Sequence, residues 1–148
     1  MDYTKTRGWR NNNPLNIEHS NAAWQGMMPE QKDKRFVDFV DMSYGYRAAI
    51  KIMLSYYHHF RLNGKIFCID NIICRWAPDG NEINYVATVE KLSKIDRYER
   101  LPRPDTQEAV DKFCRIMAAM TKVECGCPMS EVPMNKIKGG YWLAFHLK

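Results

Sequence analysis

The spacing of apolar residues changes near residue 43 and divides the chain into two parts. From Ser43 onward they recur three and four positions apart, which is the period of an amphipathic helix. The clearest run predicts a helix from Ser43 to Asn63, with apolar positions at Tyr46, Ala49, Ile50, Met53, Leu54, Tyr57 and Phe60. Shorter runs predict helices near 66–76, 82–92 and 105–120. Asp105 and Glu108 have the spacing of a capping box at the start of the last one.

Residues 15–40 instead alternate between apolar and polar positions in short runs, which is typical of β-strands. We expect strands at 15–18, 23–28 and 36–40, separated by a turn at Ser20-Asn21 and a charged loop over 29–34. The predicted fold class is therefore α+β and mainly helical, with a small antiparallel β-hairpin or sheet followed by about four helices.

The length of 148 residues suits a single domain with one core. We expect it to comprise an Asn-rich loop and small sheet (1–40), helices (41–121) and a loop-rich tail (122–148) whose apolar end packs on the core. Strands and helices do not alternate along the chain, which argues against a doubly wound fold.

Composition narrows the possible partners. The net charge of +5 favours a polyanion, such as nucleic acid or an anionic cell surface. The basic residues form no recognisable nucleic-acid motif, so nucleic acid is kept only as a minor alternative. The five cysteines and four histidines lack the spacing of zinc ligands, so we expect reduced thiols, no metal and no cofactor.

The sequence also carries an expectation about location. No stretch is long and apolar enough for a membrane span, and the first residues lack the apolar core of a signal peptide. We therefore expect synthesis in the cytoplasm. Action at the cell wall would then require lysis, a phage particle or a secretion machine.

The densest polar motif lies at residues 7–17 and is followed by Trp24. Three consecutive asparagines at 11–13 offer many hydrogen-bond donors and acceptors, and nearby tryptophans offer flat faces for a sugar ring. This combination favours a hydroxyl-rich ligand. The simpler interpretation is that the asparagines form a turn and the tryptophans belong to the core.

This motif carries a resemblance to a known family. It comprises Arg7, Gly8, Arg10, the 11–14 segment, Asn16 and Ile17, then Trp24, Gly26, Arg35, Phe36, Tyr44, Gly45, Arg47 and Ala48, and finally Ile73, Arg75 to Pro78, Tyr85 and Val86. In this order the residues resemble a family of small phage and prophage proteins that are usually described as phage structural proteins. The resemblance covers roughly residues 7–92 and implies phage particle proteins as partners.

A second resemblance is more distant. The Asn-Asn entry to a strand, the following phenylalanine, the long helix and the downstream tyrosine look like bacterial glucosaminidases with a lysozyme-like fold. That resemblance implies a lysozyme-like domain and a peptidoglycan-type glycan as substrate. In those enzymes a helix with the catalytic glutamate precedes the Asn-Asn segment, whereas no glutamate precedes Asn12 here.

Another carboxylate would therefore have to act. Cleavage of a glycosidic bond needs a general acid and usually a second carboxylate. Glu18 is the candidate acid, because it would share the polar face of the first strand with Asn16. Glu82, at a helix start, and Tyr85 are the supporting candidates, with simple surface and core roles as the alternatives. Asp38 and Asp41 have no better claim.

The remaining candidates would bind the glycan. Asparagines would hydrogen-bond to hydroxyl groups, tryptophans would stack on sugar rings, and arginines would hold an acidic group. The predicted binding residues are Arg7, Arg10, Asn12, Asn13, Asn16, Trp24 and Trp76. The leading hypothesis is a lysozyme-like domain that binds peptidoglycan-type glycans. Whether it also cleaves a glycosidic bond is left open by the sequence. The alternatives are a non-enzymatic phage structural or accessory protein and a basic nucleic-acid-binding domain.

Overall fold

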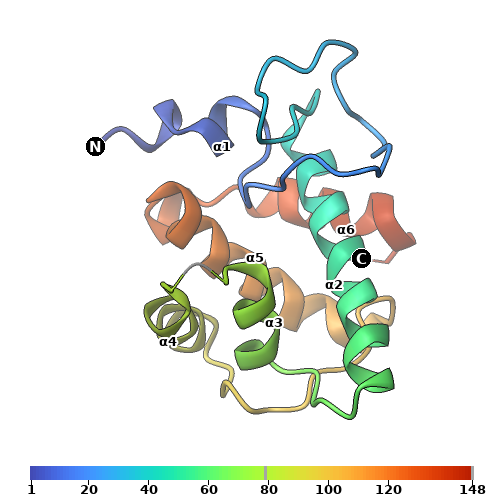
Figure 1. The fold of residues 1–148 in the computed structure, drawn as a ribbon. Coiled ribbons are helices and arrows are strands. Elements are labelled where there is room, and N and C mark those ends of the chain that lie inside the picture. Colours follow the sequence, from blue (N-terminus) through green and yellow to red (C-terminus); the bar gives the residue numbers. More distant parts are fainter. Residues whose placement is uncertain (79, 148) are drawn as a thin grey trace.

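The computed structural model describes residues 1–78 and 80–147. Its α-helices in this part of the chain are α1 (Arg7–Arg10), α2 (Met42–Leu62), α3 (Ile69–Trp76), α4 (Glu82–Ser93), α5 (Val110–Cys125) and α6 (Met134–Phe145). Short 3-10 turns are η1 (Tyr3–Lys5), η2 (Gln107–Ala109) and η3 (Met129–Glu131). In Figure 1, the blue segment between α1 and α2 arches over the N-terminal end of α2, while α3, α4 and α5 lie together below it.

The ends of the helices follow local chemistry. The Asp41 side chain accepts a hydrogen bond from the backbone N–H of Ser43 and thereby caps α2. The C-cap residues that follow α4 and α5 are Lys94 and Gly126, and both have left-handed backbone conformations. The predicted capping box does not form: Thr106 precedes η2 without a side-chain cap, and Asp105 instead pairs with Arg103.

Helix α5 lies at the centre of the core. Ten of its sixteen residues are buried, so it has almost no solvent face. Its Thr121 hydroxyl lies 2.7 Å from the hydroxyl of Tyr46, which links α5 to α2 inside the core. Phe113 stacks on Phe67, with ring centroids 5.8 Å apart. Helix α2 and the segment that contains Phe67 are therefore both packed against α5.

Helix α6 packs along α2, and a glycine permits their close approach. A Cβ atom on Gly140 would lie 2.6 Å from the carbonyl oxygen of Ser43. Tyr141 is fully buried and donates a hydrogen bond to the carbonyl of Pro104. The segment predicted as a loop-rich tail thus contains a complete helix. Five helices, not about four, follow the N-terminal loop in the described chain.

The predicted α+β, lysozyme-like fold with a β-hairpin is wrong. The described residues contain no β-strand, only isolated antiparallel bridges between Glu18 and Phe36 and between Met27 and Phe39. The alternation of residues 15–17 is real, since Leu15 and Ile17 are buried. It arises in an irregular loop instead of a sheet.

The reason lies in the backbone and in polar side chains. Asn16 has a φ of 55°, which a regular strand does not permit. Asn13 is fully buried; its side chain donates to the carbonyls of Ile17 and Val37 and accepts from the N–H of Ile17. A side chain therefore satisfies backbone groups that a neighbouring strand would otherwise pair.

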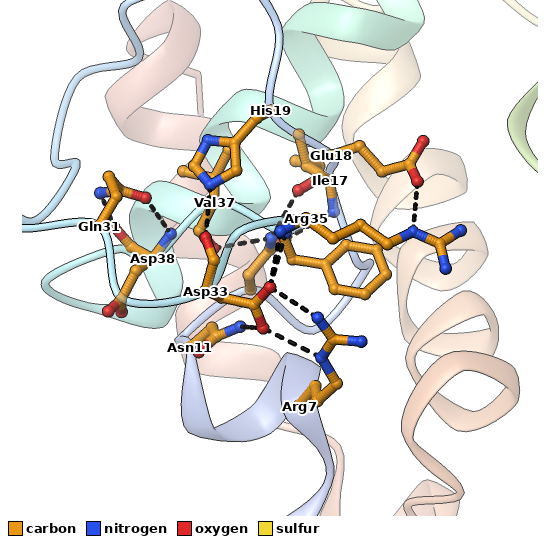
Figure 2. A network of polar contacts seen from close by, with 12 residues as sticks. Arg7, Asn11, Ile17, Glu18, His19, Gln31, Asp33, Arg35, Val37 and Asp38 are labelled. Atoms are coloured by element: carbon orange, nitrogen blue, oxygen red, sulfur yellow. Dashed lines mark hydrogen bonds and ion pairs between the residues drawn. The ribbon is translucent and has the colours of Figure 1, made fainter.

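A second anchor of the loop is Asp33 (Figure 2). Its carboxylate accepts hydrogen bonds from the side chains of Arg7 and Asn11 and from the backbone N–H groups of Arg35 and Phe36. These donors, Arg7 foremost, hold the pKa of the Asp33 carboxyl well below its usual range. The loop is thus organised by a buried amide and an ionised carboxylate.

Candidate functional site

A cleft of about 630 Å³ opens between the 15–36 loop and helices α2, α3 and α5. We call it the aromatic cleft and define it by Asn16, Trp24, Phe36, Tyr56, Trp76 and Glu124, all of which line it. The end of α5 is brought to the loop by Cys125, whose thiol donates to the carbonyl of Pro14 at 3.3 Å.

Glu124 is the central polar group of the aromatic cleft. Its Oε1 accepts a hydrogen bond from Asn16 Nδ2 at 2.9 Å, and its Oε2 accepts one from the Tyr85 hydroxyl at 2.9 Å. Burial raises the pKa of Glu124, against hydrogen bonds from Asn16, Tyr85 and Trp76 that lower it. No arginine or lysine pairs with this carboxylate among the described ion pairs. The arrangement therefore favours a carboxylic acid that retains its proton above the usual pH range.

Tyr85 supports this carboxyl from below the cleft surface. Its side chain is buried on α4, and both burial and the nearby Glu124 raise its pKa well above the usual value. The phenol therefore stays protonated and acts as a fixed hydrogen-bond donor. The sequence made Tyr85 a supporting candidate for Glu18, whereas in the structure its hydroxyl donates to Glu124.

The walls of the cleft are aromatic, with a few polar atoms left free. Trp76 packs edge-on against Tyr56, with centroids 6.2 Å apart, and the Arg75 guanidinium lies 5.1 Å from the Tyr56 ring centre. Asn16 Oδ1 and Trp24 Nε1 are buried and lack a hydrogen-bond partner within the described residues. A buried donor or acceptor without a partner is costly. Neither atom is exposed to solvent, and Asn16 Oδ1 lies beside Gly8, where an added Cβ atom would be 2.6 Å from it.

Glu18 lies on the rim of the same cleft. Its carboxylate is 58% exposed and accepts a hydrogen bond from Arg35 Nε at 2.6 Å (Figure 2). Arg35 also lies over the Phe36 ring, with 4.9 Å between guanidinium carbon and ring centre. Unlike Glu124, Glu18 faces solvent and has a cationic partner.

Other predicted site residues stabilise the loop in the structure. Arg7 pairs with Asp33 at 2.7 Å, and Asn12 donates to the carbonyl of Phe39. Asn13 has all its side-chain hydrogen bonds inside the protein, as described above. Arg10 is exposed and has no polar side-chain partner in residues 1–78 and 80–147.

Glu82 begins α4, as the sequence predicted, but it does not line the aromatic cleft. Its Oε2 atom is buried and accepts no hydrogen bond from any described residue. Of the three predicted catalytic residues, Glu18 thus lies at the rim of the aromatic cleft and Tyr85 contacts Glu124. Glu82 lies outside the cleft.

Comparison with known proteins identifies a relative. The chain is 32% identical to protein P5 of Pseudoalteromonas phage PM2 over 145 residues, which covers 95% of this chain and 82% of the relative. The chain belongs to this phage protein family. No protein-family profile matches it. The predicted phage relationship is confirmed at this level, and the comparison carries no relationship to glucosaminidases.

The sequence pattern did not single out Glu124. It lies 108 residues from Asn16 and 39 from Tyr85, so no local motif joins them. The sequence placed it just beyond the predicted 105–120 helix, at the start of the predicted loop-rich tail. Such a residue is usually a solvated helix end.

No three histidine, cysteine, aspartate or glutamate side chains lie close enough together to hold a metal ion in residues 1–78 and 80–147. None of the helices in that part of the chain has the length and apolar character needed to cross a membrane. The cysteines of that part are unpaired thiols, and burial raises the pKa of Cys125 to about 11.

Proposed function

We propose that this phage-related protein binds a peptidoglycan-type glycan in the aromatic cleft and cleaves a glycosidic bond there with Glu124 as general acid. One observation carries the proposal: a carboxyl group with a raised pKa lies in the cleft, held by Asn16 and Tyr85. A general acid must retain its proton until it reaches the substrate, and it must be held in one orientation.

The chemistry follows from this position. A protonated Glu124 would donate its proton to the oxygen that leaves the anomeric carbon, as glycosidic cleavage requires. Asn16 and Tyr85 donate to its two oxygens and so fix the plane of the carboxyl group. Glu18, paired with Arg35 at the rim, would act as the second carboxylate, either to stabilise positive charge on the sugar or to activate water.

The cleft walls suit a sugar chain. Trp24 and Trp76 line the cleft and offer flat apolar faces on which sugar rings would stack. Arg75 has no carboxylate partner among the described ion pairs, and it would bind a lactyl or peptide carboxylate of peptidoglycan. We propose that the protein reaches the wall through lysis, a phage particle or a secretion machine.

The test is digestion of purified peptidoglycan, with released fragments identified by mass spectrometry. We expect the wild type to release glycan fragments and Glu124→Gln to lose about 10²- to 10⁴-fold in rate, the usual contribution of a general acid. The matched control is Glu108→Gln, which removes an exposed carboxylate on η2 and should leave the rate unchanged. Full activity in Glu124→Gln, with the fold confirmed by circular dichroism, would refute the role of Glu124.

A second candidate is a non-enzymatic phage structural or accessory protein, and the relationship to a phage protein favours it. In that case the aromatic cleft would bind a glycan or a neighbouring particle protein without chemistry. Wild-type protein that co-sediments with peptidoglycan but releases nothing would support a binding role. Protein that does neither, but co-purifies with phage particles, would support a particle role.

A further inference from the structure

A second cavity, separate from the aromatic cleft, lies at the C-terminal end of α2. It measures about 310 Å³ and is lined by Tyr57, Arg61, Gly64, Lys65, Ile66, Phe67 and Arg100; we call it the basic pocket. It forms where two segments meet, because the N–H of Leu101 donates to the carbonyl of Phe67 at 2.8 Å. Neighbouring residues of α2 serve the two cavities: Tyr56 lines the aromatic cleft and Tyr57 the basic pocket.

The basic pocket gathers uncompensated positive charge. Three of its seven lining residues are cationic and none is acidic. Arg61, Lys65 and Arg100 are exposed and form no ion pair with a described residue. By contrast, the nearby Arg97 and Arg103 are each neutralised by a carboxylate, at 2.8 and 2.7 Å.

A purely structural explanation accounts for only one of these cations. Arg61 lies in the last turn of α2, where a positive charge interacts favourably with the helix dipole. Lys65 and Arg100 lie outside any helix, and their charges therefore have no local stabilising role. Like charges brought around one cavity repel each other, and an anion bound there would relieve this repulsion.

Two exposed aliphatic side chains belong to this region: Ile66 lines the basic pocket, and Leu62 directly follows Arg61 in the sequence. Leu62 is 87% exposed and Ile66 is 44% exposed, and both lie within the same turn region as Arg61 and Lys65. A phosphate bound from water would leave these side chains in solvent. Duplex DNA would contact the cations and gain nothing from the aliphatic groups. An anionic bilayer surface offers both phosphate groups and an apolar layer directly beneath them.

We propose that the basic pocket, with Leu62 and Ile66 at its edge, binds the surface of an anionic phospholipid membrane. A lipid phosphate occupies the pocket between Arg61, Lys65 and Arg100, and the two aliphatic side chains enter the headgroup layer. This contact is peripheral, in keeping with helices that do not cross a membrane in the described chain. It is independent of glycan cleavage in the aromatic cleft.

The test is co-sedimentation of the full chain with vesicles. One set contains phosphatidylglycerol and phosphatidylcholine in equal parts, and the other contains phosphatidylcholine alone. We expect binding to the anionic vesicles only. The double variant Lys65→Gln/Arg100→Gln should bind about 30-fold more weakly, since each cation near an anionic surface contributes about 1 kcal/mol and 1.4 kcal/mol is tenfold.

Matched controls separate the pocket from general charge. Lys91→Gln/Lys138→Gln removes the same charge from exposed positions on α4 and α6 and should retain most of the binding. Leu62→Ser removes an exposed side chain and should weaken vesicle binding without unfolding the protein. Equal losses in both double variants would overturn the proposal, as would equal binding to the two vesicle types. Vesicle binding unaffected by Leu62→Ser, together with equally tight binding of duplex DNA, would also overturn it in favour of a nucleic-acid site. Circular dichroism verifies the fold of each variant.

Discussion

Asn13 provides the sharpest quantitative test of how the cleft is built. The sequence favoured it as a glycan-binding residue, whereas in the structure its buried amide bonds only to the backbone of Ile17 and Val37. Asn13→Ala removes three hydrogen bonds at 2.9 Å. The Ile17 carbonyl retains a hydrogen bond from the N–H of Val37, but the Ile17 N–H and the Val37 carbonyl lose their side-chain partner. Two buried groups left unsatisfied cost about 1–3 kcal/mol each, so we expect a loss of about 2–6 kcal/mol.

Urea denaturation followed by circular dichroism measures this loss directly. Asn21→Ala is the control, since Asn21 is exposed and has no described hydrogen bond; it should change the unfolding free energy by less than about 0.5 kcal/mol. A loss below about 1 kcal/mol for Asn13→Ala would show that the amide does not organise the loop. The prediction from the sequence that Asn13 binds the glycan would then be the better explanation of this residue.

Three further predictions concern the acid and the loop. Tyr85→Phe removes a hydrogen bond that lowers the pKa of Glu124, so the pKa measured from the pH profile of cleavage should rise; an unchanged profile would contradict the contact. The folded pKa of Glu124 lies above its ordinary value of 4.5, so the stability that this proton contributes is present below about pH 4.5 and declines as pH rises through the folded pKa. Urea titrations at several pH values should therefore show wild type losing stability relative to Glu124→Gln toward neutral pH, and a constant difference would refute the shift. Gly26→Ala should destabilise well beyond Gly64→Ala, because both have positive φ but only the Gly26 Cβ would clash, at 2.1 Å from the Tyr44 ring; equal losses by thermal denaturation would mean that the ring moves aside.

Helical periodicity predicted the elements that bury a wide apolar face. The run ending at Asn63 corresponds to α2, and the run from Glu82 corresponds to α4, which begins at that residue. Helix α6 was not predicted, because two adjacent glycines at 139–140 indicate a loop when only the sequence is considered. In the structure Gly140 allows α6 to approach α2 closely, a constraint that local propensity does not contain.

The sheet was predicted for a sound local reason and is absent for a tertiary one. Leu15 and Ile17 do alternate with polar residues, but the intervening Asn16 has a positive φ. That conformation directs its amide toward Glu124 on α5. The alternation therefore reflects two side chains anchored in the core, with a side chain between them that hydrogen-bonds Glu124; strand periodicity cannot distinguish this pattern from a strand.

The candidate site shows the same division. Asn16, Trp24 and Trp76 were selected from their chemistry and line one cleft, and Tyr85, selected from the family resemblance, contacts the acid of that cleft. The acid itself comes from the far end of the chain, and only the packing of α5 brings it there. The sequence therefore predicted several residues of the cleft wall but not the Glu124 carboxyl, its central polar group.

The placement of Glu124 is hard to explain by stability alone. A buried carboxyl with no cationic partner weakens folding at any pH where it ionises. A glutamine would avoid that cost: its carbonyl oxygen would accept from Asn16, and its NH2 group would donate to the Tyr85 hydroxyl, which would become the acceptor. Asn16 adds to the cost, since it adopts a left-handed backbone and leaves Oδ1 without a partner in the described structure. Two adjacent unfavourable features in residues that line one open cleft are typical of functional sites. Glu124→Gln should therefore be more stable than wild type near neutral pH and catalytically impaired, whereas a variant both less stable and fully active would place Glu124 among the residues that merely hold the fold together.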